Sequence, residues 1–269
     1  MTPTPQELPA TQSGMEDKVL PEPSLVTDGE RVVISGMSGL YPSSHHIMDL
    51  SNILYNKVNP VSADKLRWSV IHPEAVQQVG AVPDLDRFDA QFFKVYYSLG
   101  NSMDPMSRKV LEQAYSAIYD AGVNPAYLSG KKVGVFIGIC FSESEKATNY
   151  DTNCKTGLSI TGCCRSMYAN RVSYWLNAKG PSMGIEESCC SSTAALEQAY
   201  LAMSRGECEA AVVGSCFLCM HPQYSVHHGR VVSLAMDGKM KSFDQNADGC
   251  TLSEAINVLF LQKAKDAFR

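Results

Sequence analysis

The sequence is short of long apolar stretches, of targeting signals and of positive charge. No run approaches the roughly 18 apolar residues that span a bilayer. The start, MTPTPQELPATQSGMEDKVLPEPS, has neither a basic n-region nor an apolar h-region, so it is not a secretory signal. The formal net charge of −5 argues against a surface that binds nucleic acid or anionic membranes. We therefore expect a cytoplasmic chain with no membrane or nucleic-acid partner.

Cysteine, in contrast, is frequent. The ten cysteines fall mostly within apolar patterns, which is typical of reduced, buried thiols rather than of a disulfide framework. Cys216-x-x-Cys219, with His221 nearby, suits metal or dithiol chemistry, but no second CxxC pair supplies further ligands. We expect no metal site, and a thiol-rich redox or metal-binding protein is only a third hypothesis.

The length of 269 residues accommodates one large α/β domain or two small ones. Residues 1–29 are rich in Pro, Thr, Glu and Ser and poor in large apolar side chains, which predicts a disordered leader. The globular part, residues 30–269, opens with RVVISGMSGLYP, a predicted strand from Arg31 to Ser35 followed by a glycine-marked turn. Its glycines do not have the G-x-G-x-x-G spacing of a dinucleotide site.

Helices and strands alternate along the rest of the chain. Asp104 and Pro105 predict a helix start, an apolar stripe continues to Ala121, and Gly122 suits the C-terminal cap. KKVGVFIGIC predicts a strand buried on both faces, and SMYANRVSYWLNA a helix. PSMGIEES predicts a strand that leads into a helix over 191–205, and EAAVVGSCF and AINVLFLQKA predict two more strands. This alternation indicates an α/β layered fold with a mainly buried sheet.

Two adjacent cysteines, Cys189 and Cys190, lie at the junction between that strand and that helix. A sharp turn there would push a side chain out of the sheet, and the helix N-terminus offers free N–H groups and the positive end of a dipole. Both effects lower the pKa of a thiol and can hold an oxyanion. Spacing alone leaves core packing as an equal alternative and does not choose between the two thiols.

The segment GPSMGIEESCCSSTAALEQAY resembles the nucleophile segment of β-ketoacyl synthases, GPS-x3-DTACSSSL-x-AL. These are the condensing domains of animal-type fatty acid synthases and modular polyketide synthases. The resemblance extends in order over Arg31 to Arg269 and is closer to the animal enzymes. It rests on VVISGMSGLYP, LDRFDAQFF, MDPMSRKVLEQAYSAIYDAGVNP, KVGVFIG, TGCCRSMYANRVSYWLNAKGPS, AAVVG and KSFDQNADG.

The resemblance implies an acyltransferase with a thiolase-like fold of two similar halves, of which this chain covers the first. It makes Cys189 the acyl acceptor, with Cys190 where the family usually has serine. An acyl group would move from the phosphopantetheine arm of an acyl carrier protein to Cys189, and the carbanion from malonyl-carrier protein would then attack the thioester. No directly bound cofactor is implied, and the full-length protein would be a homodimer active in fatty acid biosynthesis.

The chain also departs from the family pattern. The two histidines that promote decarboxylation, in HGTGT and GHxxG segments, have no counterpart among its six histidines, to which we assign no catalytic role. Glu186 and Glu187 replace an acidic residue and threonine, and they would oppose thiolate formation if they face Cys189; otherwise they form a solvated strand end. GCTLSEAI replaces GYxRxEG.

Two hypotheses follow from these departures. In the first, the chain is the amino-terminal part of a longer ketosynthase and does not condense acyl chains alone. In the second, it is a decayed copy that binds a partner. For His227 and His228 we expect a surface or loop position.

Overall fold

The computed structural model describes residues 28–62, 67–68, 72–150 and 157–267. The predicted leader, residues 1–29, lies outside this part except for its last two residues, which belong to a 3₁₀ helix, η1 (Asp28–Glu30). Within the described ranges, no helix is both long enough and apolar enough to cross a membrane.

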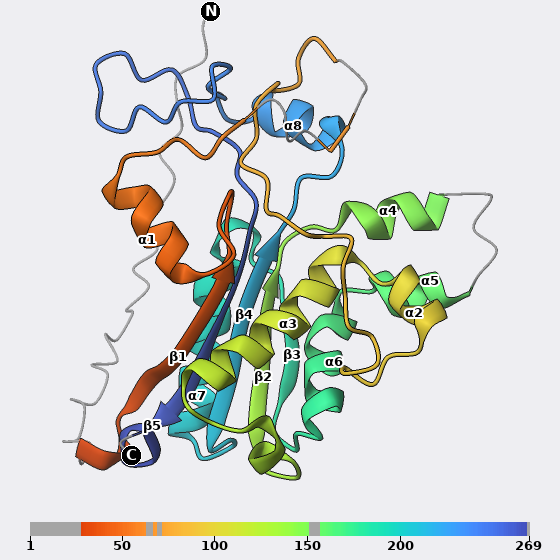
Figure 1. Ribbon diagram of the computed structural model, residues 1–269, viewed down its shortest axis with the longest axis vertical. Coiled ribbons are helices and arrows are strands. Elements are labelled where there is room, and N and C mark those ends of the chain that lie inside the picture. Colours follow the sequence, from red (N-terminus) through yellow and green to blue (C-terminus); the bar gives the residue numbers. More distant parts are fainter. Residues whose placement is uncertain (1–27, 63–66, 69–71, 151–156, 268–269) are drawn as a thin grey trace, which may run out of the picture.

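A five-stranded mixed sheet, in the order β1-β5-β4-β2-β3, organises the chain (Figure 1). β2 pairs in parallel with β3 and β4, whereas β5 is antiparallel to β4 and β1. The strands are β1 (Val32–Leu40), β2 (Val133–Ile139), β3 (Ser182–Ile185), β4 (Ala210–Phe217) and β5 (Ala255–Lys263). This arrangement confirms the predicted α/β fold and the four strands that were expected after the first.

Helices cover both faces of the sheet. α3 (Pro105–Asp120) and α6 (Ser166–Leu176) lie on one face, and α7 (Ser191–Ser204) lies on the other (Figure 1). Every residue of β2 is buried: Val135 and Ile137 pack in the cluster that contains α3 and α6, and Phe136 packs in the cluster that contains α7. Alternate side chains thus enter two apolar layers, as the continuous apolar run of this strand predicted.

The predicted helix start at Asp104 is confirmed. The Asp104 carboxylate accepts a hydrogen bond from the backbone N–H of Met106 at 2.7 Å, and Pro105 occupies the first helical position. Gly122 follows the helix with a φ of +69°, a conformation that favours glycine. Local capping chemistry therefore sets both ends of α3.

The first strand was predicted to end at Ser35, and this was wrong. β1 continues to Leu40, with a register shift between Ile34 and Gly36. Gly36 lies where α3 crosses the strand, and a Cβ there would overlap the carbonyl oxygen of Ala117. The glycine is required by this close helix–strand approach and not by a turn.

Short helices surround the ends of the strands, and the sequence did not predict them. All have fewer than ten residues, so their local pattern is weak and packing decides their form. They are α1 (Ile47–Tyr55), α2 (Tyr97–Ser102), α4 (Glu143–Tyr150), α5 (Leu158–Cys163), α8 (Pro222–Gly229), α9 (Ala264–Ala267), η2 (Pro125–Leu128) and η3 (Ser188–Cys190). α4 follows β2, and α8 follows β4, at the carboxyl ends of these parallel strands (Figure 1).

Candidate active site

Cys189 and Cys190 lie in η3, between the end of β3 and the start of α7. Both side chains are exposed, and both thiols are free. Ser188 enters this turn with a φ of +49°, a left-handed conformation that is uncommon for residues other than glycine. The predicted strand–turn–helix presentation of the two cysteines is thus present, and it depends on a strained residue directly before Cys189.

Ser191 holds this turn together. Its hydroxyl donates to the carbonyl oxygen of Ser188 at 2.7 Å and accepts from the backbone N–H of Glu187 at 2.9 Å. The side chain is buried, at 4% exposure, so neither bond is readily exchanged for water. Gly138 of β2 admits the first turn of α7, since a Cβ there would lie 2.5 Å from the Ser191 carbonyl oxygen.

The acidic residues before Cys189 differ in their surroundings. Glu186 forms an ion pair with Arg165, whose guanidinium also contacts Glu145 of α4 at 3.2 Å. Glu187 is exposed, and its carboxylate has no ion pair within the described part of the chain. The negative charge of Glu186 is therefore partly compensated by Arg165, which it shares with Glu145, whereas Glu187 fits the solvated strand end that we considered for it.

A carboxylate that the sequence analysis missed links the ends of β2 and β4. Glu143, at the start of α4, accepts hydrogen bonds from the backbone N–H groups of Met220 and His221, the latter at 3.1 Å. Burial raises the pKa of Glu143 to about 7. The acidic SESE segment after a buried strand was the available signal, because carboxylates at that edge meet the loop after the neighbouring parallel strand.

Tyr224 of α8 is close enough to Glu143 and Cys189 for their charges to affect its pKa. Its ring packs against Phe141 and Phe217, with centroids 5.3 and 5.0 Å away. Burial, with smaller contributions from neighbouring groups that include Cys140 and Cys189, raises the pKa of Tyr224 to about 12. Its phenol is therefore a neutral hydroxyl near the cysteine turn at physiological pH.

The histidines of α8 serve local roles. The Nδ1 atom of His221 accepts from the backbone N–H of Gln223 at 3.2 Å and caps the helix. His227 is exposed and lies 3.0 Å from the Gln223 side chain, and His228 stacks on Tyr224. The surface position expected for His227 is present, but both residues lie in the last turn of a helix and not in a loop.

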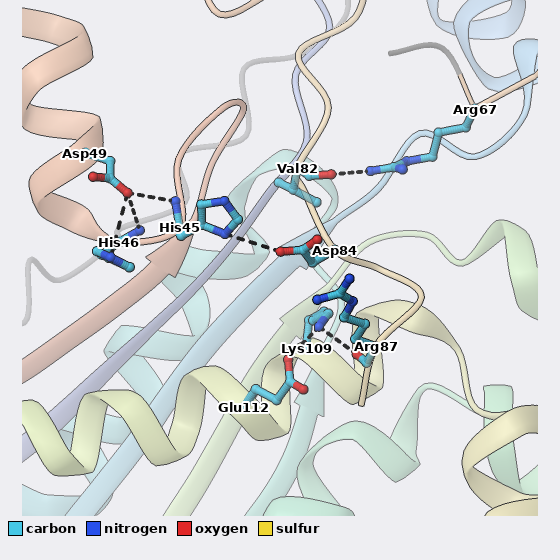
Figure 2. A network of polar contacts seen from close by, with 9 residues as sticks. All are labelled: His45, His46, Asp49, Arg67, Val82, Asp84, Arg87, Lys109 and Glu112. Atoms are coloured by element: carbon cyan, nitrogen blue, oxygen red, sulfur yellow. Dashed lines mark hydrogen bonds and ion pairs between the residues drawn. The ribbon is translucent and has the colours of Figure 1, made fainter. Parts of the chain in front are cut away.

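The other histidines also lie outside the cysteine turn. His45 contacts Asp84 (Figure 2), at a distance of 3.5 Å, and His46 contacts Asp49 of the helix that it caps. His72 accepts from the backbone N–H of Glu74. Among the described residues, the hydrogen bonds and ion pairs of Cys189 include no histidine; its contact is with the Ser188 hydroxyl at 3.9 Å.

A buried ion pair between Arg67 and Glu254 lies next to the segment that follows β4. Glu254 is fully buried and receives both Nε and Nη2 of Arg67, at 2.8 and 2.5 Å. It also accepts from the backbone N–H groups of Val82 and Cys219. Arg67 in turn donates to the Val82 carbonyl oxygen, as Figure 2 shows. Glu254 thus joins three distant segments, although the arginine and the second glycine of GYxRxEG are missing beside it.

The CxxC pair is packed into the core. Cys216 ends the buried part of β4, Cys219 follows it, and burial raises the pKa of both thiols. No group of three or more His, Cys, Asp or Glu side chains within the described ranges could hold a metal ion. These two thiols are therefore apolar core groups in their observed surroundings.

Comparisons with known proteins show the family of the chain. Residues 29–267 match the family described as "Beta-ketoacyl synthase, N-terminal domain". The chain is 41% identical over 240 residues to a fatty acid synthase of Anser anser anser, covering 89% of this chain and 68% of that sequence. It is 35% identical over 188 residues to a phenolphthiocerol/phthiocerol polyketide synthase of Mycobacterium tuberculosis, covering 70% of this chain and 10% of that sequence.

Solved structures show the same relationship. The ketosynthase from module 6 of the bacillaene synthase of Bacillus subtilis 168 superposes with a TM-score of 0.75 at 30% identity. The superposition covers 88% of this chain and 40% of that one. The matched region therefore accounts for less than half of the solved ketosynthase and for a tenth of the mycobacterial polyketide synthase.

Proposed function

We propose, because the chain belongs to the β-ketoacyl synthase family, that it provides the acyl-accepting part of a fatty acid synthase-like ketosynthase. Its fold is the thiolase-like fold of the ketosynthases. The observation that carries the proposal is the position of Cys189, an exposed thiol on a strained turn at the N-terminus of α7. Arg165 supports this role, since it offsets part of the Glu186 charge, which disfavours a thiolate.

The proposed first step is transfer of an acyl group to Cys189. The thiolate attacks the carbonyl carbon of a thioester carried on the phosphopantetheine arm of an acyl carrier protein, and a new C–S bond forms. The C–S bond to the carrier then breaks, and the carrier thiolate takes up the proton that Cys189 released. The N-terminus of α7, where the N-cap residue Cys190 makes no side-chain capping hydrogen bond, suits the transient oxyanion.

The second step is decarboxylative condensation with a malonyl thioester. In the family this step depends on two histidines, and the segments that carry them are not among the residues of this chain. We therefore propose that the chain alone accepts an acyl group but does not complete condensation. The carbanion formed by loss of carbon dioxide would have no histidine beside Cys189 to stabilise its formation.

We also propose that the full-length protein is a homodimer. β3 supports this, because it is the last strand of the sheet and pairs only with β2 among the described strands. Its Met183 is 40% exposed, so both backbone groups and an apolar side chain are available at this edge. An open edge of this kind is suited to strand pairing with another copy.

Acyl transfer to the isolated chain tests the proposal. The wild-type protein is incubated with an acyl-carrier-protein thioester, digested and examined by mass spectrometry. We expect the acyl group on Cys189, its loss in C189A and its retention in C190S, since only the first substitution removes the nucleophile. Acylation of Cys190, or none, would refute this assignment. Condensation product formed by the chain alone would contradict the separate proposal that it lacks the second step.

A further inference from the structure

An aromatic groove crosses α3 on the face of the sheet opposite to α7. It consists of two adjoining hollows of about 1030 and 670 Å³ that share Tyr115 and Tyr119. The larger hollow extends to Phe92, Trp175 and η2, and the smaller one extends to Met37 of β1. The shared tyrosines make the two hollows a single elongated surface, which fits an extended chain better than a compact ligand.

Aromatic side chains that pack against one another form the apolar lining of this groove. Tyr115 meets Phe92 edge-on at 5.3 Å, stacks on Tyr119 at 6.0 Å and lies 6.3 Å from Trp175. Tyr119 is 69% exposed and Phe92 48% exposed, although both are large side chains. A contiguous exposed aromatic surface of this kind is typical of an interaction site.

The same rings offer hydrogen-bond donors. Neither the hydroxyls of Tyr115 and Tyr119 nor the indole N–H of Trp175 donates to any residue that the structure describes. A polyproline II segment has no internal hydrogen bonds, so its carbonyl groups need outside donors. Aromatic-lined grooves bind such segments through ring packing and these donors together.

The two hollows differ in charge: Lys94 makes the larger one positive, whereas the Asp120 carboxylate lines the smaller one. Lys131 and Lys179 lie two and three residues after Ser129 and Leu176, which line the larger hollow, and a backbone hydrogen bond of 2.8 Å joins them. All three lysines are exposed, and none forms an ion pair with another described residue. A matching segment should therefore be rich in proline and acidic.

The amino-terminal segment of this chain has that chemistry. Residues 1–27 contain five prolines, and four acidic residues (Glu7, Glu16, Asp17 and Glu22) against one lysine (Lys18) give a formal charge of −4 + 1 = −3. Three of the prolines fall within the eight residues TPTPQELP, residues 2–9, which also contain Glu7. As a polyproline II helix this stretch would be about 25 Å long.

We propose that residues 2–9 bind in the aromatic groove of the same chain as a polyproline II segment. The 18 residues between Pro9 and the first described residue, Asp28, reach up to about 60 Å when extended, which is ample for a groove on α3. A segment with too few apolar residues to form its own core can become ordered when it binds to an apolar surface. The groove is on the opposite face of the sheet from α7, so this interaction is separate from acyl transfer.

Quenching of Trp175 fluorescence tests the proposal in the full chain. The sequence has two tryptophans, Trp68 and Trp175, so a W68F background leaves Trp175 as the only emitter. We expect P3A/P5A/P9A to raise the acrylamide quenching constant about twofold, because tethering keeps even a weak complex populated in the unsubstituted chain. The matched control P21A/P23A alters two prolines outside the segment and should change nothing. Equal quenching in all three proteins would overturn the proposal, with circular dichroism verifying that each is folded.

A second measurement does not depend on the tryptophan background. A fluorescein-labelled peptide of residues 1–12 is titrated into the full chain and into P3A/P5A/P9A, with binding followed by anisotropy. We expect tighter binding to the variant, whose groove is vacated, and weaker binding when Y119S is added. Equal affinities would argue against an occupied groove. If Trp175 protection in the first experiment is lost on dilution, the leader of a second copy occupies the groove and the intramolecular proposal is wrong.

Discussion

The Ser191 hydroxyl donates to the carbonyl oxygen of Ser188 at 2.7 Å and thereby closes the turn that carries Cys189. Since Ser188 is held at a φ of +49°, the turn needs contacts that outweigh its backbone strain. The same hydroxyl accepts from Glu187, so one buried side chain supplies two of these contacts.

We predict that S191A destabilises the turn. Loss of both hydrogen bonds should lower the free energy of unfolding by about 1–2 kcal/mol and slow acyl transfer to Cys189 on the order of tenfold, because the thiol is no longer held in position. Urea unfolding and the acyl-transfer assay measure the two effects. S192A alters the exposed neighbour and should match wild type; if S191A also matches it, the hydroxyl does not hold the turn.

Thiol reactivity should follow burial. Iodoacetamide at pH 8 is expected to modify the exposed Cys189 and Cys190 first, and Cys208 and Cys216 last. Burial raises the pKa of Cys208 to about 11, which lowers its thiolate fraction at this pH about a hundredfold relative to an unperturbed thiol. A time course of peptide mass spectra gives the order. Early modification of Cys216 would contradict the prediction, because it would show that this thiol of β4 is accessible to the reagent.

Glu143 should make stability depend on pH. Burial raises its pKa from 4.5 to about 7, so its folded state binds a proton more tightly than the unfolded state. Its contribution to stability is present below about pH 4.5 and is lost as the pH rises through 7. The free energy of unfolding of wild type relative to E143Q should therefore fall over this interval and level off above it. E187Q, at an exposed site, should leave the wild-type profile unchanged, and a flat difference for E143Q would contradict the assignment.

The Arg67–Glu254 pair should be strongly coupled. R67A leaves Glu254 as an unpaired buried charge and should lower the free energy of unfolding by about 3–5 kcal/mol, whereas the additional change E254A should recover part of this loss. R205A removes an exposed arginine that lies 3.9 Å from Glu207 and should cost at most about 1 kcal/mol. Denaturant titrations of the four variants test this. Additive effects of R67A and E254A would show that the two residues do not interact.

Several elements were predictable because their signals are local. The seven buried residues of β2 form one uninterrupted apolar run, and α3 has its N-cap, proline and terminal glycine within its own sequence. The strand–turn–helix around Cys189 was predictable for the same reason, and the motif resemblance chose this cysteine over Cys190 where spacing did not. That choice stays a prediction until the acyl group is located.

Other features had no local signal. The glycine at position 36 suggested a turn, but its role is set by a helix more than 80 residues later in the chain, where Ala117 passes over the strand. The short helices depend on packing against the strand ends, so their composition alone did not separate them from loops. Sequence analysis therefore placed the strands well and their connections poorly.

The sequence by itself determined the order of the main strands and helices, the burial of β2 and the position of two cysteines at the entrance to α7, because each depends on residues within a few turns of one another. Only the tertiary structure decided which charges meet: Arg165 with Glu186, the Glu143 carboxylate with the loop after β4, and Arg67 with Glu254, 187 residues apart. Such pairs are set by the packing of layers, and the electrostatics beside a thiol follow distance in space and not separation along the chain.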